Sequence, residues 1–490
     1  MTNLATLLDT PITWKKADAD PDIKEFLLDL QANILKGHGR HHTAHMFLSF
    51  AGMSAKDVAA IVRNLGHKCT SALLQLRNNR REPPNLDGGP VRCLFLSATG
   101  YKALGDGVKS PAGDAFSKGM DQRGNILGDP PRAAWNRDGW QGPKPDAMFL
   151  LADANQDRVT ADLQAAEGWL NGTGVKILII ERGLQQTRNF RPNTPEGVEH
   201  FGYVDGRSQP LFLAEDIALE DKTLWDPVFK PSQFIVADPN GKTAHAAGSY
   251  FVFRKLEQNV RGFNAAEDAL GKAIFGNKAT QDQLDRAGAM VVGRFEDGTP
   301  LVLADHGKAE AVTNDFTYAI DPDAAKCPFH AHIRKVNPRG DIERITNTAD
   351  TAPGRIRIMA RRGITYGPMR PHNADGSEFD DAGREPEKDV GLLFMAYMAS
   401  IEEQFEFTQQ SWANNPSFVG NINPKKPHPV TGIDSIIGQS ANPADRDHTY
   451  LDGWTAGAHP EKLNFARFVT MQGGEYFFAP SLSFLRNVGL

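Results

Sequence analysis

Cysteine is scarce in this chain of 490 residues, which contains only Cys69, Cys93 and Cys327. The three lie far apart and form no C-x-x-C pair, no zinc knuckle and no C-x-x-C-H cofactor-attachment motif. A small, odd number of cysteines is typical of proteins kept in a reducing compartment. We therefore expect a cytoplasmic protein that does not depend on disulfides.

Long hydrophobic runs are also missing. The longest strongly apolar stretch extends from Val390 to Ile401, well short of the ~20 residues that a membrane-spanning helix needs. Near the amino terminus, Lys15 and Lys16 follow the apolar residues, whereas a secretory signal has the reverse order. These absences predict neither a membrane span nor export.

No charge of one sign dominates. The chain has 54 Lys and Arg against 60 Asp and Glu, a net charge of −6, so we expect no broad basic face for nucleic acid. The sequence also lacks G-x-G-x-x-G, G-x-x-x-x-G-K-[ST], G-x-S-x-G and H-E-x-x-H. The common signatures of dinucleotide enzymes, P-loop NTPases, serine hydrolases and zinc proteases are therefore absent.

The first half of the chain alternates strand and helix patterns. Four short apolar runs predict strands, and two stretches with helical spacing of apolar residues predict helices. In chain order, these are a strand at 46–50, a helix at 54–66, strands at 91–97 and 147–154, a helix at 157–170 and a strand at 175–183. A loop rich in Gly, Pro, Asn and Trp covers about residues 105–145. The order β-α-β-β-α-β is that of a ferredoxin-like unit.

The second half repeats this pattern more loosely. We expect strands at 250–256, 355–362, 391–400 and 475–482, and helices at 265–276 and 401–412. The predicted fold is therefore α+β, with two ferredoxin-like halves that are each an antiparallel sheet covered by peripheral helices. The loop-rich segment 210–245 indicates a division into residues 1–235 and 236–490.

One segment with chemical potential is FGYVDGRSQP, at 201–210, in which two glycines flank Asp205 closely. Glycines at these positions would let the backbone approach a bound group. The alternative is a simple turn with an Asx hydrogen bond.

A second segment, CPFHAHIRKVNPR at 327–339, contains His330 and His332 followed by several basic residues. Neutral imidazole is a common metal ligand, and the cations would suit an anionic cofactor. A solvated surface loop is the alternative. The stretch GHGRHHTAH near residue 40 is also rich in histidine, but it lacks cysteine or carboxylate company, so we favour loop-stabilising histidines there.

A third segment is RIRIMARRGITYGP, at 355–368. If it is a strand, alternation places Arg355, Arg357 and Arg361 on one face. An arginine that points into a sheet interior is costly unless it has an anionic partner. The alternative is an edge strand with a solvated basic face.

These three segments, taken in order with others, resemble the dye-decolorising peroxidases, which are haem enzymes with a duplicated ferredoxin-like fold. The matching blocks are LQANILKGHGR, GYVDG, CPFHAHIRKVNPR, RRGITYGP, GLLFMAYMASIEEQFEF and GGEYFFAPSL. They cover nearly the whole chain and occur in the family's order. GLLFMAY and HIRKVNPR look most like the larger, fungal-like and cyanobacterial-like subgroup.

The resemblance implies a set of residue roles around a haem. His332 would be the iron ligand, with His330 as the weaker alternative. Asp205 would be the distal acid and Arg361 the distal arginine, and Arg362 should then point to the opposite face.

The resemblance also implies residues that surround the cofactor. Leu392 and Phe394 would crowd the distal face of the haem, and Arg339 would bind a propionate. Glu402 or Glu403 would be the carboxylate behind the iron-ligating histidine. The cofactor would be one non-covalent haem b per chain, held mainly by the second half.

The implied activity is reduction of hydrogen peroxide coupled to one-electron oxidation of dyes and phenolic compounds. Asp205 would move the peroxide proton and Arg361 would stabilise the charge that develops on the breaking O–O bond. Because a carboxylate has an unperturbed pKa of about 3.9, we expect an acidic pH optimum.

Bulky dyes would not fit into an apolar haem pocket, so their electrons would need a relay through the protein. Tyr366, Trp412 and Trp454 are the residues we consider, with core packing as the alternative for each.

Other functions remain open at this point. A haem carrier or sensor would need His332 but not Asp205 and Arg361 together, and a haem-free acid–base enzyme would be colourless. Chlorite-decomposing enzymes lack the distal acid loop, so GYVDG disfavours them. The sequence leaves the physiological reductant and the oligomeric state open.

Overall fold

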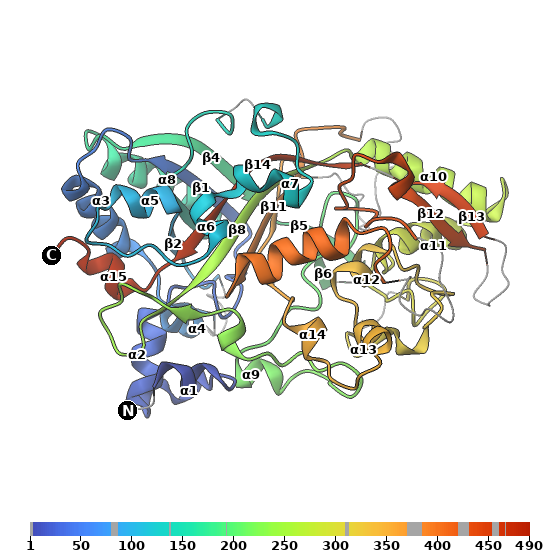
Figure 1. Ribbon diagram of the computed structural model, residues 1–490, viewed down its shortest axis with the longest axis horizontal. Helices are drawn as coiled ribbons and strands as arrows, with labels where there is room; N and C mark the ends of the chain where they lie inside the picture. Colours follow the sequence, from blue (N-terminus) through green and yellow to red (C-terminus); the bar gives the residue numbers. More distant parts are fainter. Residues whose placement is uncertain are drawn as a thin grey trace.

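The computed structural model describes residues 3–79, 87–136, 139–192, 194–308, 313–369, 385–419, 431–452, 460–465 and 467–490. The molecule is elongated, and both chain termini lie at the same end of it (Figure 1). Its centre is one twisted sheet of ten strands, to which both halves of the chain contribute.

The first half forms a ferredoxin-like unit, as predicted. Its strands are β1 (His42–Ser49), β2 (Val91–Leu96), β3 (Ala147–Asp153) and β4 (Lys176–Leu184), and its main helices are α3 (Ala55–Lys68) and α8 (Gln156–Leu170). The strands lie in the order β2-β3-β1-β4, and all neighbours are antiparallel. Ser54 caps α3, since its hydroxyl accepts a hydrogen bond from the backbone N–H of Asp57 at 3.2 Å.

The second half repeats the same topology. Its strands are β8 (Ala247–Gln258), β10 (Ile364–Tyr366), β11 (Gly391–Met398) and β14 (Val469–Ala479), with helices α10 (Val260–Phe275) and α11 (Gln281–Val292) after the first strand. The order β10-β11-β8-β14 corresponds strand for strand to the first half. The α+β prediction of two ferredoxin-like units is therefore confirmed.

The two units join edge to edge in one sheet. Strand β14 pairs with β2 through Phe478 and Leu96. At the other end, the hydroxyl of Thr365 in β10 donates to the carbonyl of Leu184 in β4 and accepts from the backbone N–H of Gln186 at 3.2 Å. The sheet therefore curves until its outer strands, β4 and β10, meet.

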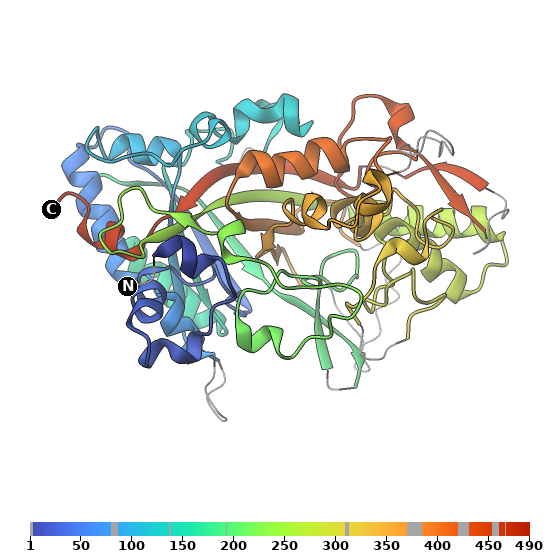
Figure 2. The ribbon, with the colours of Figure 1, turned by 60° about the horizontal axis from the view of Figure 1, so that its bottom comes forward.

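Figure 2 shows β8 and β14 running along the length of the molecule. The division at residue 235 stays a prediction.

The sheet also includes β7 (Val236–Ala237), which pairs with β8, and β9 (Ala360–Arg361), which pairs with β11. The remaining helices and strands connect and cover this sheet. They are α1 (Leu4–Leu8), α2 (Pro21–Asp29), α4 (Ala72–Asn78), α5 (Ala98–Ala103), α6 (Asp114–Lys118), α7 (Gly124–Leu127), α9 (Ala214–Ile217), α12 (His332–Val336), α13 (Asp341–Thr346), α14 (Ala352–Arg355), α15 (Leu482–Asn487), β5 (Gln186–Arg191), β6 (Thr194–Val198), β12 (Asp447–Leu451) and β13 (Pro460–Asn464). The predicted loop at 105–145 thus contains short helices. The predicted helix at 401–412 consists of two π-helical segments, Ile401–Glu406 and Thr408–Ala413.

The predicted strand at 355–362 is wrong. Helix α14 ends at Arg355, and only Ala360 and Arg361 form a strand, β9. Arg355, Arg357 and Arg361 do not share one face of a strand, because the segment that contains them is not a continuous strand. Their side chains bind to three different parts of the protein. Arg355 donates to the carbonyls of a loop near residue 226, and Arg357 pairs with a carboxylate of the π-helical segment.

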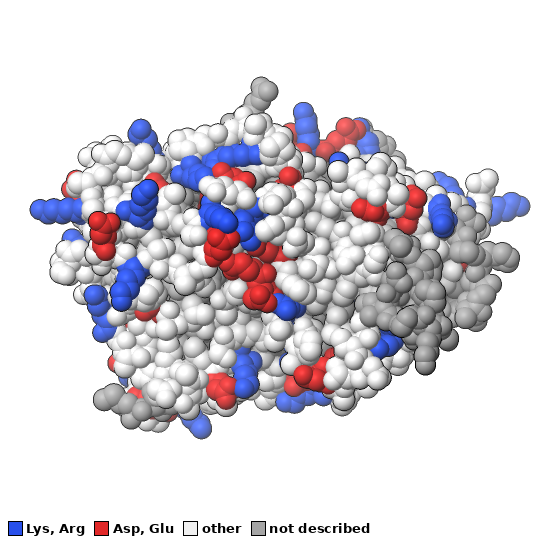
Figure 3. Space-filling view, in the orientation of Figure 1, with Lys and Arg blue, Asp and Glu red and all other residues white. Residues whose placement is uncertain are grey.

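The surface in Figure 3 carries both signs of charge, with basic and acidic side chains side by side near its centre. Within the described ranges, no helix is both long and apolar enough to cross a membrane.

Candidate functional site

A largely apolar cavity of about 230 Å³ lies between the sheet of the second half and the loops that cover it. Strand β11 contributes Leu392 and Phe394, which are two residues apart and therefore point to the same side. Both line this cavity, which we call the inner cavity. His332, Asp205 and Arg361 line it as well. The structure thus brings together residues from four segments that are distant in sequence.

His332 is the first residue of the short helix α12. Its Nδ1 lies 2.9 Å from Oδ2 of Asp434, whose side chain is fully buried. Burial opposes ionisation of Asp434, but the hydrogen bond with His332 and the backbone N–H donors nevertheless lower the pKa of that carboxyl. With Nδ1 donating to Asp434, Nε2 is the ring nitrogen left to act as a ligand.

The carboxylate behind His332 is therefore Asp434, and the assignment to Glu402 or Glu403 is wrong. Glu402 accepts a hydrogen bond from the backbone N–H of Ala115 at 2.7 Å, and Glu403 pairs with Arg357. The helical register turns both carboxylates away from the imidazole.

His330 does not line the inner cavity. Its ring is buried against His448, with ring centroids 4.5 Å apart, and against Tyr450 at 4.8 Å. Burial lowers the pKa of His330 well below the usual value, so its imidazole is neutral. This placement favours His332 as the ligand.

Asp205 and Arg361 face each other at the edge of the inner cavity. Nη1 of Arg361 lies 3.4 Å from Oδ1 of Asp205, and Nη2 donates to the carbonyl of Arg207 at 2.7 Å. Both side chains are about one-third exposed, so small molecules can reach them. The loop that holds Asp205 has two glycines with positive φ, Gly202 at 103° and Gly206 at 80°, which explains the G-x-x-x-G spacing.

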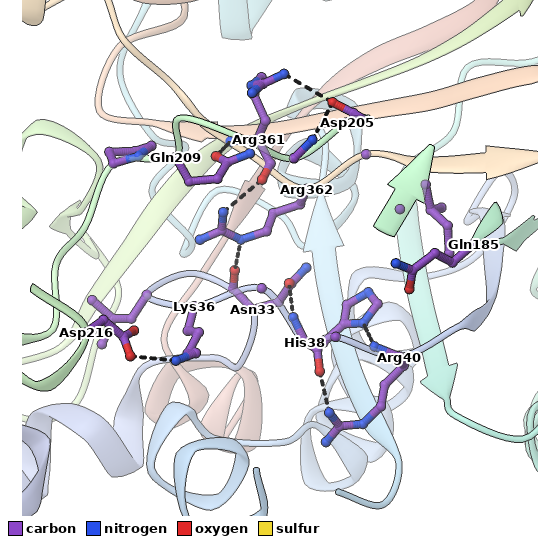
Figure 4. A pocket seen from close by; sticks show the side chains of 18 of the residues that line it. Asn33, Lys36, His38, Arg40, Gln185, Asp205, Gln209, Asp216, Arg361 and Arg362 are labelled. Carbon is purple, nitrogen blue, oxygen red and sulfur yellow. Dashed lines mark hydrogen bonds and ion pairs between the residues drawn. The ribbon is translucent and has the colours of Figure 1, made fainter. Parts of the chain in front are cut away.

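A second cavity of about 540 Å³, which we call the outer chamber, shares Asp205, Gly206, Arg361 and Leu392 with the inner cavity. Residues of the LQANILKGHGR block form one of its walls (Figure 4). Arg362 lies on this side, turned away from Arg361, as the alternation predicts. The two cavities therefore meet at the Asp205–Arg361 pair.

Arg339 lies behind the inner cavity and does not line it. Nη1 donates to the carbonyl of Asn314 at 2.6 Å, whereas Nε and Nη2 are buried without a partner among the described residues. Arg294 does line the inner cavity, and its Nη2 donates to the side chain of the same Asn314 at 2.9 Å. Burial lowers the pKa of Arg339 to about 9 and that of Arg294 to about 10. Neither forms an ion pair within the described ranges.

The three proposed relay residues have different positions. Tyr366 is buried in β10, its hydroxyl has no partner in the described part of the chain, and Nζ of Lys255 lies 5.1 Å from its ring. Trp412 is stacked on Phe418 with ring centroids 5.3 Å apart. Trp454 lies outside the described residues.

Motif reading missed three residues of the site. Asp434 and Arg294 stand in segments without a recognisable signature, and only the fold brings Arg294 to the cavity and Asp434 to the back of His332. Glu199 also lines the inner cavity, and its carboxylate accepts from the backbone N–H groups of Phe201 and Tyr203 at 2.9 and 3.0 Å. Burial raises the pKa of Glu199 to about 7. The only feature of the sequence that could have indicated a role for Glu199 is its position just before the GYVDG motif.

The histidine-rich stretch near residue 40 stabilises a loop. Nδ1 of His38 accepts from the backbone N–H of Arg40 at 2.9 Å, and His38 is buried. Among the residues that the structure describes, no group of three or more His, Cys, Asp and Glu side chains is arranged to hold a metal ion.

Comparison with known proteins gives consistent matches. Residues 226–420 match the family model described as "Dyp-type peroxidase, C-terminal". The chain is 40% identical to the multifunctional dye peroxidase DyP2 of Amycolatopsis sp., over 98% of this chain and 99% of the relative. It is 31% identical to Peroxidase 2 of Mycetinis scorodonius, over 98% of this chain and 90% of the relative.

Solved structures agree. The DyP2 structure from Amycolatopsis superposes with a TM-score of 0.86 at 38% identity and covers 99% of this chain and 100% of its own. A DyP-type peroxidase from Anabaena sp. superposes with a TM-score of 0.85 at 33% identity and covers 99% of both chains.

Proposed function

This chain belongs to the dye-decolorising peroxidases, haem enzymes that use hydrogen peroxide to oxidise dyes and phenolic compounds, and we propose that His332, Asp205 and Arg361 perform this chemistry. One observation carries the assignment. His332, whose Nδ1 is held by the buried Asp434, lines the same apolar cavity as the Asp205–Arg361 pair.

The residues of the inner cavity fit a haem. Its walls are mainly apolar, and His332 offers Nε2 as an iron ligand while Asp434 holds Nδ1. Arg294 lines the cavity and donates to neutral oxygens, whereas Arg339 lies behind the cavity and has two buried nitrogens without an acceptor among the described residues. Arg294 would bind a propionate of one non-covalent haem b directly, and Arg339 would add positive charge behind that propionate.

When bound, the haem would supply the iron at which peroxide is reduced, and the dye would replace the electrons that peroxide removes. Asp205 accepts a proton from one peroxide oxygen and delivers it to the other, which leaves as water. Arg361 stabilises the negative charge that develops on the separating oxygen. The outer chamber gives peroxide and small phenols a route to this pair. Leu392 and Phe394 restrict the space beside it.

Single-residue variants of the haem-loaded enzyme test the assignment. We expect a rapid change in the Soret band of the wild-type protein after one equivalent of peroxide. Asp205→Asn and Arg361→Leu should slow this change by at least 100-fold while the protein still binds haem. His332→Ala should abolish the Soret band of a histidine-ligated haem.

Two results would overturn the assignment. A Soret band that is inert to peroxide in the wild-type protein would indicate haem carriage or sensing. Wild-type rates in both Asp205→Asn and Arg361→Leu would show that other groups move the proton and stabilise the charge.

A further inference from the structure

Arg362 is a half-buried cation beside the outer chamber, without a carboxylate partner in the described ranges. Its guanidinium donates three hydrogen bonds to backbone carbonyls, from Nε to Asn33 at 2.8 Å, from Nη2 to Ile34 at 2.9 Å and from Nη1 to Arg361 at 2.8 Å. Burial lowers the pKa of Arg362 to about 10, so the group remains charged at neutral pH. Such a cation is costly to bury, and neutral carbonyls compensate it only in part.

These bonds link Arg361 to a segment more than 300 positions away in sequence. Strand β9, which contains Arg361, has only two residues, so its ladder to β11 gives little support. The backbone N–H of Arg362 bonds to the carbonyl of Met395 at 2.6 Å, and that of Arg361 bonds to Oε1 of Gln209 at 3.1 Å. The Arg362 side chain holds the other end of this residue, because its guanidinium binds the carbonyl of Arg361 and, at the same time, the carbonyls of Asn33 and Ile34 (Figure 4).

The receiving segment is shaped in advance. Asn33 has a left-handed backbone conformation, with φ at 69°, and its side-chain oxygen accepts from the backbone N–H of His38 at 3.0 Å. Gln75 of α4 accepts from the backbone N–H of Asn33 at 2.6 Å and donates to the carbonyls of Lys36 and Gly37 at 3.0 and 3.1 Å. The carbonyls of Asn33 and Ile34 are therefore presented to the guanidinium by a fixed loop.

We propose that Arg362 is a positioning residue, which holds the backbone of Arg361 against the loop at 33–37 so that the Arg361 guanidinium faces Asp205. The amino-terminal LQANILKGHGR block is thereby part of the peroxide-activating site, although it lies far from the cavity residues in sequence. This inference rests on the proposed function, which assigns the peroxide chemistry to Arg361 and Asp205.

The test compares Arg362→Lys with a matched control in the haem-loaded enzyme. Lysine retains the charge, but its single nitrogen cannot reach three separate carbonyls in the same way. Arg486 in α15 serves as control, because it also donates to two backbone carbonyls, those of Gly66 and Cys69, and lines neither cavity. The measurements are the rate constant of the Soret change with peroxide, the affinity of the ferric enzyme for fluoride and the melting temperature.

We expect Arg362→Lys to lower the peroxide rate constant by about 10- to 100-fold, because small displacements of a catalytic group have effects of this size. Fluoride affinity, which reports on an anion beside Arg361, should fall in the same direction as in Arg361→Leu. Arg486→Lys should leave both within twofold of the wild type. If Arg362→Lys does not fold, the test uses Gln75→Leu, which removes hydrogen bonds that hold the same loop. The peroxide rate constant and the fluoride affinity should then fall in that variant.

Two outcomes would overturn the proposal in distinguishable ways. Loss of rate and fluoride affinity in Arg361→Leu but not in Arg362→Lys, even with a lowered melting temperature, would show that Arg362 is only structural. Wild-type behaviour of Arg361→Leu itself would refute the proposed function, and the inference that rests on it would fall with it.

Discussion

Asp434 is the residue whose charge acts most directly on the imidazole of His332. Its carboxylate is fully buried and lies 2.9 Å from Nδ1 of His332. The other carboxylate oxygen accepts from the backbone N–H groups of Ile436 and Ile437 at 2.8 and 3.0 Å. These donors hold the carboxylate in place and keep it ionised, so it can increase the electron-donating strength of the histidine.

We therefore predict that Asp434→Asn weakens the iron ligand. The amide still accepts a hydrogen bond but carries no negative charge, and the peroxide rate constant should fall by about 10- to 100-fold. The reduction potential of the haem should rise, which a spectroscopic titration measures. Glu403→Gln is the matched control and should change neither quantity more than twofold. If Glu403→Gln changed both quantities and Asp434→Asn changed neither, the carboxylate behind His332 would be Glu403 and not Asp434.

Tyr366 provides a second test at a single residue. Its phenol is buried in β10 and its hydroxyl has no partner among the described residues, so Tyr366→Phe should cost little stability. If this ring relays electrons, the variant should lower kcat for a bulky anthraquinone dye by about tenfold. Oxidation of a small phenol, which enters the outer chamber, should be unchanged. Equal effects on both substrates would exclude the relay, and Tyr397→Phe, at another buried tyrosine, serves as control.

At the level of secondary-structure elements, Thr365 closes the curved sheet. Its hydroxyl lies between the carbonyl of Leu184 and the backbone N–H of Gln186, where β4 ends and β5 begins. The contact joins the second half of the chain to the first on the side opposite the β14–β2 pair. Because β10 has only three residues, one side chain contributes much of this closure.

Thr365→Val should therefore destabilise the protein. Valine has nearly the same shape but removes the hydroxyl's two hydrogen bonds, to the carbonyl of Leu184 and from the N–H of Gln186, which costs about 1–3 kcal/mol. Urea unfolding followed by circular dichroism measures the change in the free energy of unfolding. Thr160→Val, whose hydroxyl bonds to a carbonyl on the exposed surface of α8, should change it by less than about 0.5 kcal/mol. An equal decrease in the free energy of unfolding in the two variants would show that the Thr365 hydroxyl contributes no more than an exposed one.

For the molecule as a whole, buried histidines set the response to acid. Burial lowers the pKa of His45 and of His448 to about 4, and that of His38 to about 3. The unfolded chain, with its ordinary histidine pKa near 6.5, therefore binds more protons than the folded protein between these values. The stability that these histidines contribute is complete above about pH 6.5 and is lost as the pH drops towards 4. Glu199, whose pKa burial raises to about 7, acts in the opposite direction over this range.

His45→Gln should reduce this loss. Removing one histidine whose pKa is about 2.5 units below the ordinary value should make the decrease in the free energy of unfolding between pH 7 and pH 4 smaller by about 3 kcal/mol. Urea unfolding at pH 7, 5.5 and 4 provides the measurement. His67→Gln, at an exposed position of α3, is the control and should follow the wild-type curve. A variant curve parallel to the wild-type curve would contradict this explanation.

Local sequence patterns were sufficient to predict the architecture and the identity of the main reactive groups. Strands β3 and β11 are almost continuous runs of apolar residues, and Ser54 and Asn155 cap the helices α3 and α8 that follow them. Such local patterns are independent of the rest of the chain, so they can be read directly. The ordered motifs likewise pointed to His332, Asp205 and Arg361.

Only the tertiary structure decided which side chains stand behind these groups. Asp434 is 102 positions from His332, and Asn33 is 329 positions from Arg362. No local pattern encodes such pairs, because they form when separate elements meet. For the same reason the alternating arginines at 355–361 indicated a strand, whereas their actual partners lie in three different parts of the fold. Local sequence thus specifies the elements and the reactive groups, and the packing of distant segments specifies how those groups are held and charged.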